Sequence, residues 1–407
     1  MIRKLKQLLY FPVAGYFRFF AGIQLALWKP QILVITGSNS KTTLLHLIES
    51  QLGNKAKYSH QANSSFGIPF DILNLKRKTL EIWEWPFLFL LTPFYAFKNP
   101  PSEKIYVVEA DCDRPGEGKF LSNLLKPEVT LWANSSNSHA QNFPTPIDEN
   151  IAFEFGYFVE KTKNLCIVNG DSALITSQLT RTRADVMKIT KSHLKNYSLQ
   201  KNGASYKIEN LVYSFKYLLP EDSFYSVSMT LALLEYLGIP PDVKFKNFII
   251  PPGRSSTFKG IKNTTIIDSS YNATPSSMKV ILDMFKKYSA ENKWLVLGDM
   301  IELGPDEKIE HEKLSKLIDD VGAKQVILVG PRLNKYTNPK SKFIKFDQPK
   351  EALDYIKNHI KGHEVLLFKG ARFLEGIIEH LLLNKSDISR LCRREKVWEN
   401  RRRRWGL

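Results

Sequence analysis

Short apolar runs alternate along the chain with longer segments in which apolar residues recur at helical spacing. Apolar runs that end in polar turns are typical of buried parallel strands. In the first half of the chain the expected strands are Ile32–Ile35, Ile105–Glu109, Val129–Ala133 and Leu165–Asn169. Ser223–Leu237 has a helical pattern that Gly238 ends. This order predicts an α/β fold with a mostly parallel central sheet.

The turn-rich stretch Pro251-Pro252-Gly253 predicts a domain boundary, and the alternation starts again beyond it. There the expected strands are residues 265–268, 294–298, 325–329 and 364–368, and the expected helices are residues 276–288 and 307–321. We expect a central domain followed by a smaller, Rossmann-like α/β domain. The domains are placed at residues 1–30 (a basic, aromatic-rich segment), 31–250, 251–385 and 386–407 (a basic tail).

The formal net charge of +17 is concentrated at the two ends of the chain. Residues 1–30 carry five basic and no acidic side chains, and residues 390–407 carry eight basic and two acidic ones. Because a nucleic-acid groove needs a basic patch on a folded surface, this distribution indicates no nucleic-acid partner. Binding of nucleic acid by the arginines of residues 401–404 is the weaker alternative.

The three cysteines, Cys112, Cys166 and Cys392, show neither pairing nor metal-binding spacing. This pattern predicts a reducing, cytoplasmic environment and no zinc site. Two aromatic-rich stretches, Phe19–Trp28 and Trp85–Phe97, are each too short to span a bilayer. With the basic chain ends they could contact the anionic inner face of a membrane. The alternative is that both stretches pack inside the fold, and the sequence leaves the choice open.

An apolar strand runs into Thr36-Gly-Ser-Asn-Ser-Lys-Thr-Thr43 and then into a helix, as in a phosphate-binding loop. Such a turn directs several backbone N–H groups and the helix dipole at one point. Lys41 would contact the β- and γ-phosphates of a nucleotide, and Thr42 would offer its hydroxyl to Mg²⁺. The strict GxxxxGK[ST] pattern fails, because Ile35 and Ser40 stand at its glycine positions. We nevertheless expect a P-loop-type central domain.

Further segments follow this loop in a recognisable order: Asn63–Pro69, Val107–Glu109 with Asp113–Glu117, Lys126–His139, Asp268–Met278, Leu297–Gly304 with His311, and Lys369–Arg372. Together with the loop, which is similar to the sequence TGTNGKT, they resemble the motifs of the Mur ligases. The last three groups resemble the branch that adds D-alanyl-D-alanine to a UDP-muramoyl tripeptide. The resemblance covers roughly residues 31–385.

Mur ligases are ATP-dependent, amide-forming enzymes of peptidoglycan synthesis, in which an amine attacks an acyl phosphate made from ATP. The resemblance implies catalytic roles for Lys41, Glu109, His139, Arg254 and Asp268. It implies that Mg²⁺ is held by Thr42, Glu109 and His139. It implies that ATP contacts Thr36, Gly37, Ser38, Asn39, Ser40, Lys41, Thr42, Thr43, Ser226, Arg254, Asp268 and Asn272. The alternatives are a surface ion pair for Glu109, a structural role for His139, and a bridge between domains for Arg254 and Asp268.

Four features depart from the family pattern. Ser40 replaces the loop glycine, Phe155 stands at the position of the carbamoylated lysine, and Ser226 at that of an adenine-contacting asparagine. Under a shifted alignment, Lys161 or Lys163 would be the carbamoylated residue. The family's N-terminal UDP-binding domain is expected to be absent, since about 30 residues precede the loop strand. The substrate would then be lipid-linked or supplied by a partner.

The sequence therefore favours an ATP-dependent amide ligase that acts on a cell-envelope precursor bearing a carboxylate. Its amine substrate is expected to be an amino acid or a dipeptide. We expect a monomer in the cytoplasm or at the inner face of the membrane. The alternative is a diverged, non-catalytic Mur-like protein that binds nucleotide or serves as a scaffold, and Phe155 and Ser226 are the residues that distinguish the two.

Overall fold

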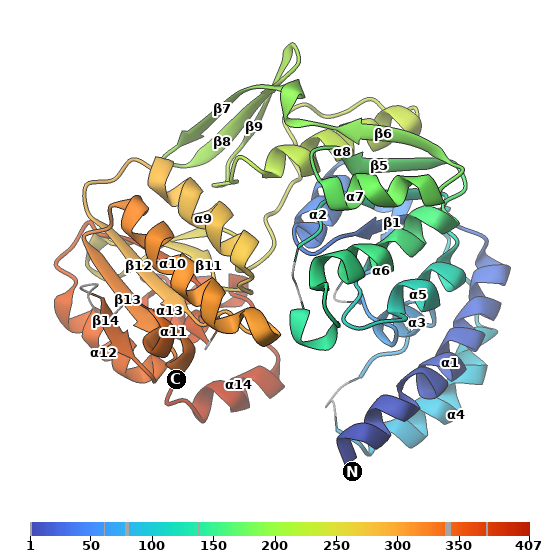
Figure 1. The fold of residues 1–407 in the computed structure, drawn as a ribbon, viewed down its shortest axis with the longest axis horizontal. Helices are drawn as coiled ribbons and strands as arrows, with labels where there is room; N and C mark the ends of the chain where they lie inside the picture. Colours follow the sequence, from blue (N-terminus) through green and yellow to red (C-terminus); the bar gives the residue numbers. More distant parts are fainter. Residues whose placement is uncertain (1, 61, 78–80, 137–138, 338–342, 372) are drawn as a thin grey trace.

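The computed structural model describes residues 2–60, 62–77, 81–136, 139–337, 343–371 and 373–407. Figure 1 shows two α/β units side by side, with a small antiparallel sheet at the top of the view. Arg372, the last residue of one predicted motif, lies outside the described residues.

The first unit is built on a six-stranded sheet in which all paired strands are parallel. In sheet order the strands are β2 (Ala56–Tyr58), β3 (Ile105–Ala110), β1 (Gln31–Thr36), β4 (Val129–Trp132), β5 (Leu165–Asn169) and β6 (Asp185–Ile189). Successive side chains point to opposite faces, so Val34 and Val108 join one core and Leu33 and Val107 the other. The predicted parallel sheet is confirmed, and its strands are continuously apolar because both faces are covered.

Helices cover the two faces of this sheet. One core contains side chains from α1 (Ile2–Trp28), α3 (Gly67–Ile72), α4 (Glu84–Ala96), α5 (Glu117–Leu125), α6 (Ile147–Lys161) and α7 (Ala173–Gln178). The other contains side chains from α2 (Lys41–Leu52) and α8 (Ser223–Tyr236). Because the strands are parallel, their carboxyl ends share one edge of the sheet, where α/β folds place their sites.

The second unit also has a six-stranded sheet, with the order β10-β11-β15-β12-β13-β14. The strands are β10 (Ser256–Lys259), β11 (Thr265–Ser269), β15 (Val365–Lys369), β12 (Lys293–Gly298), β13 (Gln325–Val329) and β14 (Ile344–Phe346). Among the described strands of this sheet, only the edge strand β10 pairs in the antiparallel sense. One face of the sheet is covered by α9 (Pro275–Lys287), α10 (Glu307–Val321) and α11 (Pro331–Tyr336). The other face is covered by α12 (Pro349–His359) and α13 (Leu374–Leu381). The predicted α/β fold class is confirmed.

The small antiparallel sheet comprises β7 (Leu194–Gln200), β8 (Gly203–Ile208) and β9 (Leu211–Phe215). Its buried side chains, among them Tyr206 and Phe215, join the core beneath α2 and α8. The pattern of apolar runs did not reveal these strands, because β7 is largely polar and the apolar Leu211 and Val212 of β9 are exposed.

The N-terminal region differs from the expected short apolar run. α1 is one 27-residue helix that continues through Pro12, and its Leu8–Trp28 part is long and apolar enough to cross a membrane by length and composition. The apolar stretch Phe19–Trp28 that the sequence singled out is therefore one part of a longer helix, and it is the longer helix that reaches this length. One side of the helix nevertheless packs against the first unit, since Ala14, Phe17 and Ala21 are fully buried.

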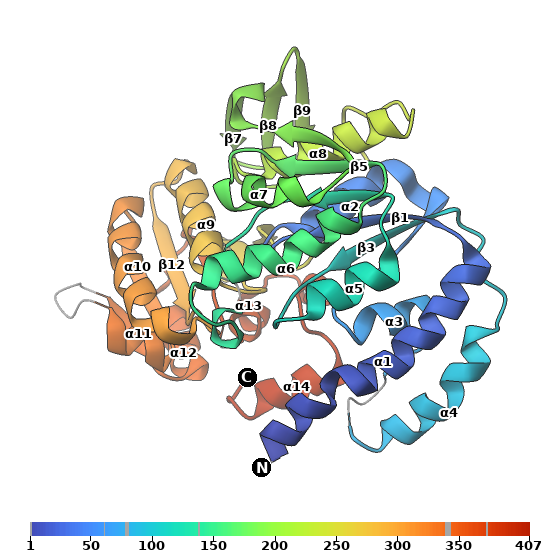
Figure 2. The same cartoon turned by 45° about the vertical axis from the view of Figure 1, so that its right-hand side comes forward.

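The C-terminal segment folds back onto the second unit instead of extending from it. Arg394 pairs with Glu379 of α13 at 2.6 Å, and Arg402 of α14 (Lys396–Arg403) is buried. Figures 1 and 2 place α14 below the sheet of the second unit.

Candidate functional site

The phosphate-binding loop lies between β1 and α2, as the sequence predicts. Gly37 has φ +123°, and a Cβ atom there would lie 2.5 Å from the carbonyl oxygen of Asn134, so the close approach requires glycine. Ser40 has φ 67°, the left-handed conformation that favours glycine. The backbone at Ser40 thus adopts a conformation that favours glycine, although the residue is serine.

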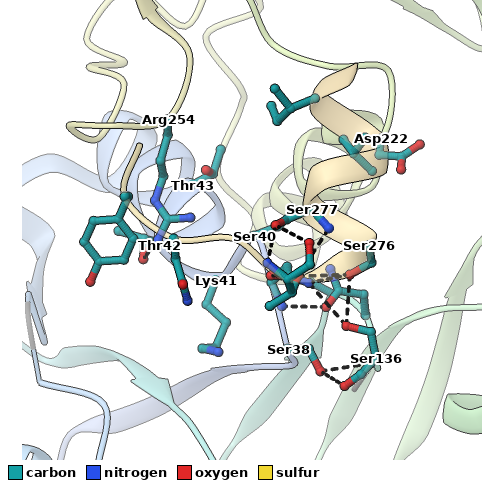
Figure 3. A pocket seen from close by; sticks show the side chains of 18 of the residues that line it. Ser38, Ser40, Lys41, Thr42, Thr43, Ser136, Asp222, Arg254, Ser276 and Ser277 are labelled. Carbon is teal, nitrogen blue, oxygen red and sulfur yellow. Dashed lines mark hydrogen bonds between the residues drawn. The ribbon is translucent and has the colours of Figure 1, made fainter. Parts of the chain in front are cut away.

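Lys41 begins α2 and is buried within the pocket (Figure 3). Its Nζ atom lies 2.8 Å from Oδ2 of Asp111 and also donates to the carbonyl oxygen of Gly37. Asp111 directly follows β3 and was not among the predicted site residues. Its place just beyond the carboxyl end of a predicted parallel strand was the signal that could have revealed it.

Thr42, Glu109 and Arg254 come from three separate segments and meet at one point. The Thr42 hydroxyl donates to Oε2 of Glu109 at 3.2 Å and accepts a hydrogen bond from Nη2 of Arg254 at 3.0 Å. Figure 3 shows Arg254 reaching toward Thr42 from the second unit. Burial raises the pKa of Glu109, and the charges of Lys41 and Arg254 partly offset this effect.

These donors could hold a divalent cation. A threonine hydroxyl and a carboxylate are the hard oxygen ligands that Mg²⁺ prefers, so Thr42 and Glu109 fit the ion that the sequence predicts. Asp111, Asp113 and His139 form a further group whose possible ligand atoms all lie within 4.8 Å of one another. A third group, His46, Glu49 and His60, lies outside the pocket.

His139 connects the two units. Its Nε2 atom lies 3.1 Å from Oδ1 of Asp113, and its Nδ1 atom lies 2.7 Å from Oε2 of Glu302. Burial acts to lower the pKa of His139, but the hydrogen bond to Glu302 and the carboxylates of Asp113 and Asp111 outweigh it and raise the pKa to about 9. Both ring nitrogens are therefore engaged with carboxylates in this conformation, and the role of His139 as a metal ligand stays a prediction.

The loop also contacts the start of α9. The Asn39 side-chain amide donates to Oγ of Ser276 at 2.9 Å and to Oγ of Ser136 at 3.3 Å, and its oxygen accepts from Thr274. Figure 3 shows Ser276 and Ser136 beside the loop. The second unit thereby closes over the phosphate-binding loop through direct side-chain hydrogen bonds.

The remaining predicted residues of the second unit lie close to this contact. Asp268, next to the last residue of β11, is a fully buried carboxylate whose Oδ1 accepts from the backbone N–H of Ser270, and it does not line the pocket. Asn272 does line it, and its carbonyl oxygen accepts from Nζ of Lys369 at 2.6 Å. Burial and the neighbouring charge of Arg254 lower the pKa of Lys369 to about 7.

The departures from the family pattern have clear positions. Ser226 is buried in α8 and lines the pocket. Phe155 lies fully buried in the core, 6.1 Å from the ring of Trp132, and is not part of the pocket. Lys161 and Lys163 lie outside the pocket as well, and they pair with Glu160 and Glu128 respectively.

The pocket that these residues line has a volume of about 320 Å³ and lies between the two units. Several of its polar residues were given no site role from the sequence, namely Asp111, Asn134, Asn169, Tyr271, Ser276, Glu302 and Lys369. All of them except Asp111 and Asn169 lie within the segments that resemble the family motifs. Asn134 and Asn169 lie at or just after the ends of β4 and β5, so the strand-end rule would have indicated both. Ser276 and Glu302 belong to the second unit, and no local pattern predicts what they face.

Two models of known families match the chain: the Mur ligase middle domain at residues 35–231 and the Mur ligase glutamate ligase domain at residues 253–372. The chain belongs to the Mur ligase family. The phosphate-binding loop and the residues that close over it both lie within the matched residues.

Among curated relatives, this Mur ligase is 24% identical over 375 residues to the UDP-N-acetylmuramoyl-tripeptide–D-alanyl-D-alanine ligase of Buchnera aphidicola from Acyrthosiphon pisum, covering 87% of this chain and 77% of the relative. It is also 24% identical to the enzyme of the same name from Bacillus subtilis, covering 86% and 76%. Among solved structures, the MurF ligase from Thermotoga maritima in complex with ADP has a TM-score of 0.73 at 20% identity, covering 95% and 84%.

These similarities confirm the prediction of a Mur-type, ATP-dependent, amide-forming ligase with an α/β architecture. The alternative of a non-catalytic Mur-like scaffold is not favoured by them. The predicted domain boundaries and the roles of individual site residues remain predictions.

Proposed function

We propose that this Mur ligase binds ATP with Mg²⁺ at the loop and joins an amine to the carboxylate of a cell-envelope precursor. The γ-phosphoryl group passes from ATP to a carboxylate oxygen, and ADP leaves. The amine nitrogen then attacks the acyl carbon, so that a C–N bond forms, the C–O bond to phosphate breaks and the amine loses a proton. The convergence of Thr42, Glu109 and Arg254 beside Lys41 is the observation that carries this proposal.

Each of these residues has a defined task in the proposal. Lys41 exchanges Asp111 for the phosphates and neutralises their charge, and Arg254 adds a second positive charge from the other unit. Thr42 and Glu109 would hold Mg²⁺, which supplies charge neutralisation at the transferring phosphoryl group. Asp268 orders the turn that carries Asn272. His139 would become available as a Mg²⁺ ligand when its contact with Glu302 opens.

The two units enclose the reaction. Since an acyl phosphate is readily hydrolysed, a site formed between closing domains protects it from water. The hydrogen bonds from Asn39 to Ser276 and from Arg254 to Thr42 join the units at the loop. They support a closed form as the reactive one.

For the substrates, the names of the relatives support a dipeptide such as D-alanyl-D-alanine as the amine and a muramoyl tripeptide as the carboxylate. We propose that the carboxylate is presented either on a soluble nucleotide or on a lipid. We further propose a monomer in the cytoplasm, in peripheral contact with the membrane. The three cysteines are unpaired and buried, which suits a reducing compartment.

The test is a titration of the protein with ATP in the presence of Mg²⁺, with Lys41→Ala as the comparison. We expect saturable binding that the substitution abolishes. Phosphate release should then appear only when both a carboxylate precursor and a dipeptide are added. Lys163→Ala is the matched control, because this exposed lysine lies outside the pocket and pairs with Glu128.

Equal ATP binding by the wild type and Lys41→Ala would contradict the proposed role of the loop. ATP binding without phosphate release, for both soluble and lipid-linked precursors, would contradict the proposed reaction while leaving the nucleotide site intact.

A further inference from the structure

α4 has apolar side chains on its exposed side as well as on its buried side. Its buried residues Glu84, Leu88, Thr92 and Ala96 recur every four positions and face the interior. Phe89 packs against α1, since its ring lies 5.0 Å from those of both Tyr16 and Phe17, and Tyr16 donates to its carbonyl oxygen. A surface helix of a water-soluble domain normally has polar residues on its outer side, and α4 does not.

The outer side of α4 is exposed. Phe87, Leu90 and Phe94, spaced three and four residues apart, are 59%, 69% and 72% exposed. The exposed apolar residues in and around this helix, which we call the α4 face, are Ile82, Trp83, Phe87, Leu90, Leu91, Phe94 and Phe97. Glu84 is the only charged residue of α4, and it is buried, so the α4 face carries no charge of its own. Contiguous exposed apolar surface of this kind marks a binding site.

Basic residues lie at the same end of the molecule. Figures 1 and 2 both place α4, the N-terminal end of α1 and the C-terminal helix α14 along the lower edge. The first helix begins with Arg3, Lys4 and Lys6 and contains no acidic residue. In the segment of α14, Arg401, Arg403 and Arg404 are exposed. The apolar α4 face and the exposed arginines of the α14 segment therefore lie along the same edge of the molecule.

We propose that the α4 face inserts into the headgroup region of an anionic lipid bilayer, while the exposed side chains of Arg401, Arg403 and Arg404 contact lipid phosphates. α4 would lie in the plane of the interface and would not cross the membrane. α1 does not cross it either, because its buried side remains part of the core of the first unit. This inference deepens the proposed function, since a ligase held at the bilayer can take its carboxylate substrate from a lipid carrier.

Charge complementarity selects a lipid surface over a second copy of the chain. Two copies that met through the α4 face would bring their basic segments together, and like charges would oppose the contact. A bilayer containing anionic lipid offers both an apolar layer and a negative surface, which are the two properties that this end of the molecule matches.

The test is co-flotation of the full-length protein with vesicles of phosphatidylcholine, with or without phosphatidylglycerol. The variant Phe87→Ser, Leu90→Ser, Phe94→Ser should lower the partition coefficient on anionic vesicles by about tenfold for each side chain removed from the apolar layer. The matched control is Leu211→Ser, Val212→Ser, which removes exposed apolar side chains of β9 at the opposite end of the molecule and should change nothing.

A second variant tests the electrostatic part. Arg401→Gln, Arg403→Gln, Arg404→Gln should lower the partition coefficient by about fivefold for each charge, and the loss should shrink as salt is added. Vesicles without phosphatidylglycerol should bind the wild-type protein weakly.

The proposal is overturned if the wild type does not float with anionic vesicles, or if the α4 variant floats as well as the control. It is also overturned if the wild type self-associates without vesicles and the α4 variant abolishes only that association. ATP titration of the same variants separates this result from the ligase function, because the α4 face lies outside the pocket and nucleotide binding should be unchanged.

Discussion

Ser40 gives the sharpest prediction, because its conformation and its residue type disagree. It has φ 67° and ψ −4°, and its side chain makes no capping hydrogen bond at the start of α2. An L-residue in the left-handed region is strained by about 1–2 kcal/mol, whereas glycine adopts that region freely. Ser40→Gly should therefore relieve strain at this position.

The expected gain is smaller than the strain itself. Glycine also raises the entropy of the unfolded chain, which offsets about 0.4–1 kcal/mol. The free energy of unfolding should rise by about 0.5–1 kcal/mol for Ser40→Gly. Ser40→Ala keeps a Cβ atom in the same strained conformation, so its change should stay within about 0.5 kcal/mol.

The assay is urea unfolding followed by tryptophan fluorescence, in which a shift of the midpoint at constant slope reports stability. Ser50 is the control position, because it lies within α2 and is not among the residues with positive φ. There glycine should be less stable than alanine by about 1 kcal/mol, which is the opposite sign. If Ser40→Gly is also less stable than Ser40→Ala, backbone strain at Ser40 is refuted.

Four other substitutions each test a single contact or position. Gly37→Ala should abolish ATP binding in the titration, because its Cβ atom would lie 2.5 Å from the Asn134 oxygen. Asp111→Asn removes the carboxylate that pairs with Lys41, so the Lys41 ammonium group is free for the phosphates before ATP binds. The dependence of ATP binding on Mg²⁺, measured by titration, should therefore weaken. Phe155→Lys should lower the unfolding free energy and should not raise turnover when bicarbonate is added, because position 155 is in the core. The folded-state pKa of Lys369 is about 7, below the ordinary 10.5. Between pH 7 and pH 10.5 the unfolded state therefore binds more protons than the folded state does. Wild-type stability relative to Lys369→Met, measured by urea unfolding at several pH values, should thus rise by about 1 kcal/mol per pH unit from pH 7 to 10.

The sequence predicts the buried frame of this protein well and its cross-unit contacts poorly. β5, α10 and β13 begin and end at the expected residues, because strands covered on both faces are continuously apolar and helical repeats end at glycine. The motif resemblance brought Thr42, Glu109 and Arg254 together although 212 positions separate the first and last of them. Periodicity alone contains no information about such pairs.

The missed features share one physical origin. Asp111, Glu302 and Lys369 acquire their roles from partners far away in sequence, namely Lys41, His139 and Asn272. α14 is held to α13 by ion pairs, whereas the composition of this segment shows only an excess of positive charge. Likewise, no pattern shows which apolar side of α4 the fold would cover.

The departures from the family pattern act on different parts of the reaction. Ser40 retains the left-handed backbone of the loop, and the side chains that would meet the phosphates, Lys41 and Thr42, remain in the pocket. Ser226 lines the pocket, and a serine in place of the asparagine that the resemblance implies there would remove a hydrogen bond to the base, worth about 1 kcal/mol. Phe155 is different, because a core position next to Trp132 offers no route for a carbamate into the site. Nucleotide affinity should therefore survive these changes. Any loss should fall on the phosphoryl-transfer step, where Asp111 and Asp113 are the carboxylates left to replace the missing negative charge.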